Sequence, residues 1–124
     1  PAGLGADLTM PAPFCDAALL VTTPDAVAVR GAASASALLW QAGLQNQRLV
    51  INQVPRLLVR SGTIEDLDDV IDGTGVQLIG LVPDDQGVKA AAAAAVPLGR
   101  CPAKTAFDNL AARVCGRYVE LIRL

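Results

Sequence analysis

The sequence predicts an α/β fold with three layers, a mainly parallel sheet with flanking helices. Three short runs are apolar nearly throughout, at residues 17–22 (AALLVT), 48–54 (RLVINQV) and 76–82 (VQLIGLV). Continuous apolar character is typical of strands covered on both faces. The chain between successive runs is long enough for the crossovers that parallel neighbours require. Aromatic residues make up only 3% of the chain, so the core is built from small and aliphatic side chains, which suits helices packed on a sheet.

The two segments between these strands are predicted helices. In the first, Thr23 is a good N-cap, Pro24 suits the first helical position, and Gly43 ends the helix. In the second, Thr63 with an acidic residue three positions later resembles a capping box, and Gly73 supplies the stop. An apolar stripe at helical spacing lies between those two ends and consists of Ile64, Leu67, Val70 and Ile71.

Two more helices are predicted after the third strand. Six consecutive alanines at residues 90–95 favour a short helix, because alanine has the highest helix propensity, and Val96 and Pro97 close it. A last helix is predicted from Pro102 to the C-terminus. Its core stripe follows helical spacing and consists of Phe107, Leu110, Ala111, Val114, Cys115, Tyr118, Leu121 and Ile122.

Composition and charge argue against several classes of protein. Ten basic against twelve acidic residues give a net charge of −2, without the basic stripe of a nucleic-acid-binding protein. No apolar run approaches the ~20 residues that a membrane-spanning helix needs. The chain has no histidine, which argues against a zinc site and against Ser-His or Cys-His nucleophile pairs. We expect Cys15, Cys101 and Cys115 to be buried, reduced thiols in a cytoplasmic protein.

Polar residues follow the predicted strands at the edge where open α/β sheets bind ligands. Asp84 and Asp85 come directly after the third strand, but adjacent residues of an extended chain point apart, so a hydrolytic pair is not favoured. Asn52 interrupts the apolar second strand. Its amide either holds a neighbouring loop or presents the donor and acceptor that read a purine edge. With neither GxxxxGK[ST] nor GxGxxG present, no catalytic and no metal-binding residue is assigned.

Four stretches together resemble the second half of the MinD/ParA family of deviant P-loop ATPases, with a pattern like that of its MinD-type, septum-site-determining branch. They are PAG at residues 1–3, VTTPDAVAVRGA at 21–32, LVINQV at 49–54 and LIGLVPDDQGV at 78–88. The resemblance covers essentially all 124 residues. In that family Asp-x-Pro-Ala-Gly leads into switch II, which implies that Pro1, Ala2 and Gly3 belong to a switch loop whose strand precedes them.

The resemblance also implies a nucleotide site. Asn52 would contact the adenine, while Val82, Pro83, Asp84 and Asp85 would form the loop that closes over the base. ATP or ADP with Mg²⁺ would be the cofactor of the parent protein. The residues that hold phosphate and Mg²⁺ lie upstream in relatives, so this chain alone is expected neither to hydrolyse ATP nor to bind nucleotide tightly.

A dimer and partner face is implied at the first predicted helix, near Pro24 and Arg30. The sequence departs from the family pattern at two positions. Gln53 follows the adenine asparagine where relatives often have Arg, and Gly31 follows the helix arginine where they often have Asp. These departures bear on the contacts with the base and on the recognition of partners.

By this resemblance residues 1–124 are the C-terminal portion of one P-loop ATPase domain, without its phosphate-loop half. The implied function is adenine binding and dimerisation in an ATPase that helps to place the cell-division site. The parent is expected in the cytoplasm and peripherally at the inner face of the membrane, with a division-regulator protein as partner and no direct nucleic acid. Two alternatives stay open, a non-catalytic interaction module of the same fold and a chromosome-partitioning ParA-type ATPase.

The predicted sheet has an unpaired edge. Three parallel strands leave apolar backbone unpaired along at least one side, and such edges tend to pair with another chain. We therefore expect a homodimer, or a higher association, through the open edge of the sheet.

Overall fold

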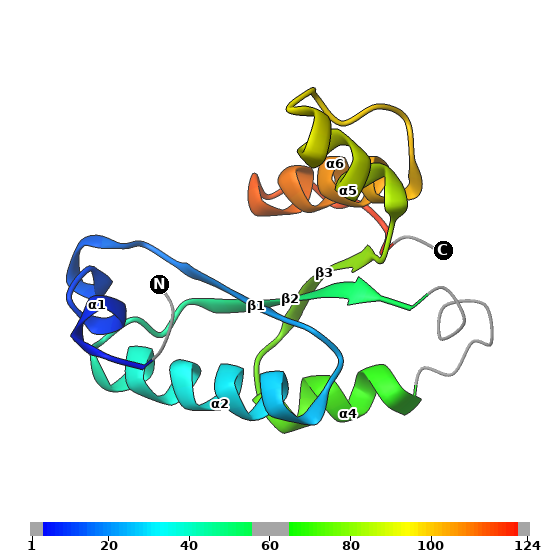
Figure 1. Cartoon of the computed structure of the whole chain (residues 1–124). Coiled ribbons are helices and arrows are strands. Elements are labelled where there is room, and N and C mark those ends of the chain that lie inside the picture. The colour runs from blue at the N-terminus through cyan, green and yellow to red at the C-terminus, as the bar shows by residue number, and fades with distance from the viewer. Residues whose placement is uncertain (1–3, 56–64, 122–124) are drawn as a thin grey trace.

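A parallel three-stranded sheet with helices on both faces organises the chain. The computed structural model describes residues 4–55 and 65–121. Strands β1 (Ala18–Thr22), β2 (Gln47–Val54) and β3 (Leu78–Pro83) pair in the order β1-β2-β3. Helices α2 (Ala26–Gln41) and α4 (Glu65–Thr74) lie on one face, and α5 (Gln86–Ala94) and α6 (Pro102–Val114) lie on the other (Figure 1). The predicted α/β class and parallel sheet are confirmed.

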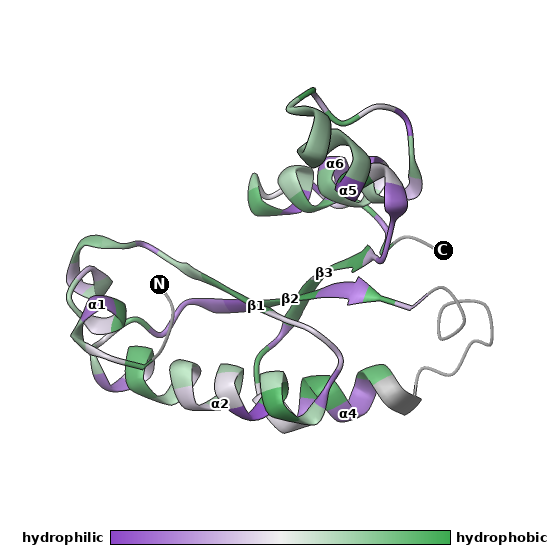
Figure 2. Ribbon diagram, in the orientation of Figure 1, coloured by the Kyte–Doolittle hydropathy of each residue, from purple (hydrophilic) through white to green (hydrophobic). Residues whose placement is uncertain are grey.

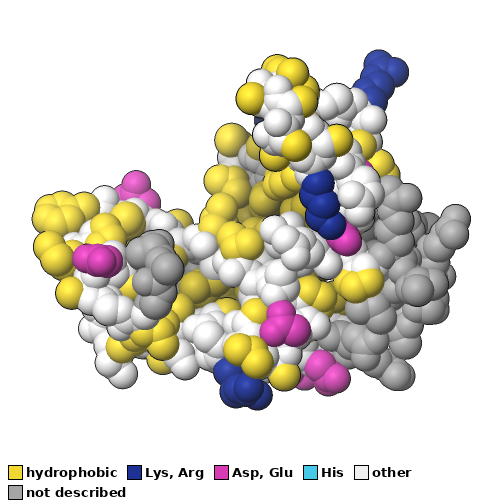
Figure 3. All heavy atoms as spheres, in the orientation of Figure 1, with side chains coloured by type: hydrophobic (Ala, Val, Ile, Leu, Met, Phe, Trp, Pro, Cys, Tyr) yellow, Lys and Arg dark blue, Asp and Glu magenta, His cyan; other side chains and the backbone are white. Residues whose placement is uncertain are grey.

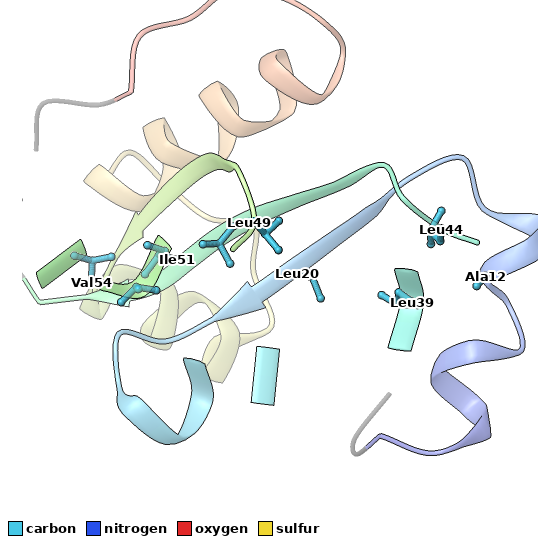
Figure 4. Packing of buried hydrophobic residues seen from close by; sticks show 9 residues of the cluster. Ala12, Leu20, Leu39, Leu44, Leu49, Ile51 and Val54 are labelled. Carbon is cyan, nitrogen blue, oxygen red and sulfur yellow. The ribbon is translucent and has the colours of Figure 1, made fainter. Parts of the chain in front are cut away.

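A short N-terminal segment precedes the sheet. It contains α1 (Ala6–Thr9) and a 3-10 turn, η1 (Ala12–Phe14). Ala12 is buried and packs into the core beside Leu44, near the C-terminal end of α2 (Figure 4). The segment therefore closes the end of the sheet at which β2 begins.

The three strands differ in how completely they are covered. Leu49, Val50 and Ile51 of β2 are all buried, so both faces of the central strand are covered. On β1, however, Leu19 is 46% exposed and Val21 62% exposed. The expectation that each strand is covered on both faces is wrong for β1. The reason is that α2 covers only one face of β1, while α6 packs on β3 at the opposite edge (Figure 1).

Helix α2 begins two residues later than its sequence suggests. Asp25, and not Thr23, is the N-cap, and its carboxylate accepts hydrogen bonds from the backbone N–H groups of Val27 and Ala28. The Thr23 hydroxyl donates to the same carboxylate. These hydrogen bonds, that from Thr23 foremost, lower the pKa of Asp25 below its ordinary value of 3.8. The helix ends as predicted at Gly43, whose φ of +92° suits glycine.

Helix α4 runs past the glycine that was expected to stop it. Gly73 lies inside α4, and the helix ends at Gly75, where φ is +67° and the N–H donates to Ile71 O. Gly73 serves close packing instead, because a Cβ there would lie 2.8 Å from Cγ1 of Val29 on α2. Leu67, Val70 and Ile71 face the core as predicted. Thr63 and Ile64 lie outside the described residues.

The last two helices begin and end elsewhere than the sequence indicates. Helix α5 starts before the alanine run, because Asp85 caps it. Helix α6 ends at Val114 and not at the C-terminus, since Gly116 adopts a φ of +79° and reverses the chain. Arg113 then holds the returning segment. It donates from Nε to Val119 O at 2.8 Å and from Nη1 to Ile79 O at 2.7 Å.

The stripe predicted for the last helix is correspondingly too long. Ala103 and Ala106 are buried and Leu110 packs beside them, whereas Phe107, Val114, Cys115 and Tyr118 are exposed. The cysteine prediction is also wrong in part. The three thiols are free, but Cys15 and Cys115 are exposed and Cys101 is half-buried. In the described part of the chain no helix is long and apolar enough to cross a membrane.

Two apolar clusters lie on opposite faces of the sheet. The larger one joins β1, β2, α2 and α4 around Leu20, Leu39, Leu49, Ile51 and Val54 (Figure 4). The smaller one joins β2, β3 and α6 around Val50, Val82, Ala103 and Ala106. Helix α6 approaches the sheet closely, because a Cβ at Gly80 of β3 would lie 2.9 Å from Cδ1 of Leu110. Both clusters hold the carboxyl ends of β2 and β3 in place.

Candidate functional site

Strand β2 is irregular where it approaches its carboxyl end. Its register with β3 shifts between Ile51 and Val54, and Gln53 has a positive φ of 55°. A non-glycine residue in this region costs about 1–3 kcal/mol, so the surrounding structure must hold it there. Asn52 Oδ1 accepts a hydrogen bond of 2.9 Å from Gln53 N. The hydrophilic end of β2 is visible in Figure 2. Such bulges re-aim side chains beside binding sites.

A cavity of about 110 Å³ opens at this irregular end of β2. It lies between the carboxyl ends of β2 and β3, the first turn of α5 and one turn of α6. All five residues predicted to surround an adenine line it, although they come from two strands. The complete lining is Asn52, Gln53, Val82, Pro83, Asp84, Asp85, Val88, Lys89 and Phe107. The cavity thus combines apolar walls with a few polar groups, as small-molecule sites do.

The two adjacent carboxylates of this cavity have separate partners. Asp84 forms an ion pair of 2.9 Å with Lys89, and both side chains are about half exposed, so the pair contributes little to stability. Asp85 is only 6% exposed. Its Oδ1 accepts from Gly87 N at 2.8 Å and its Oδ2 from Ala103 N at 3.1 Å. The two carboxylates therefore bond to different groups.

Asn52 is the polar group best placed to meet a ligand. It is half-buried, and it lines both this cavity and a second hollow along β1. One lone pair of its oxygen is used by Gln53 N. The amide N–H₂ makes no hydrogen bond with another of the described residues. The side chain can therefore still donate, and its oxygen retains a second lone pair.

The other predicted site residues lie apart from this cavity. Pro1, Ala2 and Gly3 fall outside the described residues. Pro24 is half-buried just before the cap of α2, and Arg30 is exposed on that helix. Neither lines the cavity between the strand ends, so a partner face near Pro24 and Arg30 would be a separate surface.

Three residues of the cavity wall were not singled out from the sequence. Val88 and Lys89 come from the first turns of α5, and Phe107 comes from α6. The pattern assigned Phe107 to a core stripe, because its spacing from Leu110 is helical. No local signal distinguishes an aromatic residue in a core stripe from one at a cavity, since the difference depends on where α6 docks.

A second, larger hollow of about 610 Å³ runs along β1. Its walls are the N-terminal segment, the outer side of β1 and the small residues of α2. The lining is Leu4, Leu8, Leu19, Leu20, Val21, Thr22, Thr23, Ala28, Gly31, Ala32, Ala35 and Asn52. Figure 3 shows apolar atoms gathered where the molecule is hollowed, between the N-terminal segment and the block of α5 and α6. Strand β1 pairs only with β2 among the described strands, so its other edge is open.

The donor groups for a metal ion are not gathered in this part of the molecule. Across residues 4–55 and 65–121 no three Cys, Asp or Glu side chains come together in a way that could hold one. The acidic groups at the strand ends already bind Lys89 and backbone N–H groups.

Solved structures of MinD proteins share the fold of this chain, a parallel sheet flanked by helices on both faces. A chain of the MinC:MinD cell division protein complex from Aquifex aeolicus matches with a TM-score of 0.85 and 23% identity, over 98% of this chain and 51% of that one. MinD complexed with Mg-ADP from Pyrococcus horikoshii matches with a TM-score of 0.72 and 22% identity, over 92% and 47%.

Sequence comparison agrees with the structural match. The septum site-determining protein MinD of Bacillus subtilis is 33% identical over 125 residues, which are 98% of this chain and 47% of that protein. A putative MinD of Emiliania huxleyi is 31% identical over 98% of this chain and 46% of that protein. The chain is therefore a homologue of MinD septum site-determining proteins over nearly its whole length. It spans about half the length of the curated relatives it matches. No family model matches it.

Proposed function

We propose that this chain is the adenine-binding and dimerising half of a MinD/ParA-like ATPase that helps to place the cell-division site. In this proposal residues 1–124 correspond to the C-terminal portion of one P-loop ATPase domain. The supporting observation is the cavity that Asn52, Val82, Pro83, Asp84 and Asp85 share at the strand ends. Asn52 lies about thirty positions before the other four residues, which are consecutive, and the parallel pairing of β2 and β3 brings them together.

The cavity suits the base of a nucleotide for chemical reasons. Adenine is flat and apolar on its faces and carries donors and acceptors only on its edge. Val82 and Pro83 offer apolar contact, while the Asn52 amide offers a donor and an acceptor to the edge. Asp84 and Asp85 serve the shape of the loop, through their bonds to Lys89 and to the helix N-termini, and do not donate to the base.

The role of Asn52 is tested by ATP binding to the complete protein. Asn52→Ala removes the edge-reading amide and is expected to weaken ATP binding about 5- to 50-fold, because it leaves polar atoms of the base unpaired. Asn46→Ala is the matched control, since Asn46 is exposed and lies outside the cavity lining. Isothermal titration calorimetry of both variants measures the effect. Unchanged affinity of Asn52→Ala would remove Asn52 from the site.

Hydrolysis is assigned to the other half of the parent protein. A relative of this chain is a MinD complexed with Mg-ADP. Phosphoryl transfer depends on groups that position the phosphates and neutralise their charge, and by the family resemblance those groups would lie in the part of the parent that precedes residue 1. We therefore propose that the parent uses ATP or ADP with Mg²⁺, while this chain alone neither hydrolyses ATP nor binds it tightly.

Association through the open side of β1 is the second part of the proposal. The edge of β1 is unpaired by the described strands, and Leu19 and Val21 leave apolar surface beside it. Such an edge recruits another strand. We propose a homodimer or a further association there, and a division-regulator protein as partner near Pro24 and Arg30, as one relative is solved in a MinC:MinD complex. We place the parent in the cytoplasm and peripherally at the inner membrane face.

Light scattering of the isolated chain tests the open edge. At high concentration the wild-type chain is expected to show a dimer or a larger species, and Val21→Lys is expected to shift it towards monomer, because a charge then lies on the apolar strand. Val96→Lys is the matched control, since Val96 is 55% exposed, follows α5 and does not line the hollow. A wild-type chain that stays monomeric would contradict this part of the proposal.

The same exposed surface favours one alternative, a non-catalytic interaction module of the MinD fold. Its supporting observation is the bare face of β1, which a protein partner could cover. The two functions differ in the role of Asn52. A base-binding half requires the Asn52 amide for ATP affinity, whereas an interaction module tolerates Asn52→Ala without loss of partner binding.

A further inference from the structure

Helix α6 brings an aromatic ring to the wall of the strand-end cavity. Phe107 lines the cavity together with Asn52, although it lies 55 positions away in the chain. It is 40% exposed, whereas its neighbours Ala103 and Ala106 are buried against the sheet. The small residues thus dock α6, and Phe107 keeps free apolar surface at the cavity instead of filling the core.

The combination of Phe107 with Asn52 is chemically specific. An aromatic ring stacks on a flat heteroaromatic group, and an amide beside it reads the edge of that group. Val82 and Pro83 supply further apolar surface. Aromatic side chains that stack on bases add substantially to affinity and discriminate little between one base and another. The amide would then supply the selectivity and the ring the affinity.

The position of Phe107 depends on Asp85. The buried Asp85 carboxylate bonds to Gly87 N in the first turn of α5 and to Ala103 N in the first turn of α6. Ala103 lies one helical turn before Phe107. A single carboxylate therefore ties the start of α6 to the loop that follows β3. Close packing leaves little freedom here, because a Cβ at Gly87 would lie 3.1 Å from Asp85 Oδ1.

We propose that Phe107 is the stacking wall of the cavity, and that Asp85 is a positioning residue that holds Phe107 there through α6. The proposal rests on the proposed adenine-binding function and extends it to a helix that the sequence resemblance did not implicate. Asp85 then acts on nucleotide affinity without touching the base, and Phe107 touches the base directly.

The experiment measures ATP affinity in the complete protein for three variants of Phe107 and one control. Phe107→Leu keeps an apolar side chain but removes the ring, and we expect ATP binding to weaken about 5- to 100-fold. Phe107→Tyr and Phe107→Trp keep a ring and are expected to stay within about threefold of the wild type. Phe14→Leu is the control, because Phe14 is the other phenylalanine, 90% exposed and outside the cavity lining.

The outcomes separate this inference from the function on which it rests. If Asn52→Ala weakens ATP binding and Phe107→Leu does not, the stacking wall is wrong while the base site stands. If neither substitution changes ATP affinity, both the base site and the stacking wall are wrong. If both weaken it, and Phe107→Tyr restores it, the inference holds. Melting temperatures of all variants show that the comparison is made between folded proteins.

A double-mutant cycle tests the positioning role of Asp85. Asp85→Ala alone is expected to weaken ATP binding, because α6 loses its tie to α5. If Asp85 acts through Phe107, the substitution has little further effect in the Phe107→Leu background, so the two effects are not additive. A merely structural role for Asp85 predicts the same loss of affinity in both backgrounds. Additive effects would overturn the positioning role.

Discussion

Helices cover the two faces of the sheet to different extents. On the face of α2 and α4, buried side chains form one cluster that includes β1 and β2, with Leu20, Leu49 and Ile51 at its centre. On the face of α5 and α6, the buried cluster includes β2 and β3 but no residue of β1. The outward side chains of β1, Leu19 and Val21, remain exposed. The same strand thus helps to close one face of the molecule and leaves the other open.

The difference follows from where the connections of the chain place α2 and α6. Helix α2 follows β1 directly and returns over it, so local connectivity covers that face of β1. Helix α6 is tied to α5 by Asp85 and packs on Gly80 of β3, so it docks at the other side of the sheet. A second strand or helix would be needed over β1 to complete the face. The exposed face of β1 is therefore a surface on which a further strand or helix could pack.

The largest expected change in stability comes from a substitution at a buried strand position, and it is compared with one at an exposed strand position. Ile51→Ala is expected to destabilise the fold by about 2–5 kcal/mol, because Ile51 is fully buried between α2 and α4 and the sheet. Val21→Ala is expected to change stability by less than about 0.5 kcal/mol, since Val21 is mostly exposed. Urea denaturation of both variants measures the difference. The comparison is made at a protein concentration at which the chain is monomeric, and equal losses would then mean that another part of the chain covers this face of β1.

Two glycine-to-alanine substitutions are expected to change stability by smaller amounts and in opposite directions, and they test how α6 packs on the sheet. Gly80→Ala is expected to destabilise by about 1 kcal/mol, because the added Cβ would lie 2.9 Å from Leu110 Cδ1, so that the Leu110 side chain or α6 must shift. Gly31→Ala on α2 is the matched control and is expected to stabilise by about 0.5–1 kcal/mol, since the added Cβ meets none of the other described residues within 4 Å apart from its own stretch of helix backbone. Thermal unfolding reports both. A stabilising Gly80→Ala would mean that α6 does not pack on β3 as described.

The smallest effect concerns the start of α2 and depends on pH. The folded pKa of Asp25 is lowered, so its charged form stabilises the fold above the unfolded pKa of about 3.8. This contribution is lost as the pH falls through the folded pKa. Asp25→Asn keeps a capping oxygen but no charge. We expect the variant to be slightly less stable than the wild type at pH 7 and equal to it near pH 2. A pH-independent difference would contradict the sign.

Much of the architecture could be predicted because it depends on local pattern. The continuous apolar runs marked all three strands, and Gly43 marked the end of the first long helix, since only its own backbone conformation matters there. The ends of α4 and α6 could not be predicted in this way. The sequence indicated Gly73 as the end of α4, but Gly73 lies inside the helix, where it allows close packing against Val29 of α2.

Some residues of the candidate site could also be predicted from the sequence, and others could not. Asn52 and the loop from Val82 to Asp85 were visible in the sequence, because polar residues that interrupt or follow apolar strands are conspicuous. Their meeting around one cavity followed from parallel pairing. The sequence did not indicate Phe107, whose helical spacing is the same in a core stripe and at a cavity wall.

By itself, the sequence determined the class of fold, the order of the strands and helices and the polar residues at the strand ends. These depend on periodicity and composition, which act over a few neighbouring residues. The tertiary structure alone decided which glycines terminate helices, which face of β1 is bare and which aromatic residue reaches the cavity. Those features depend on contacts between segments that are distant in the chain. The free energy of such contacts cannot be predicted from the pattern of a few neighbouring residues.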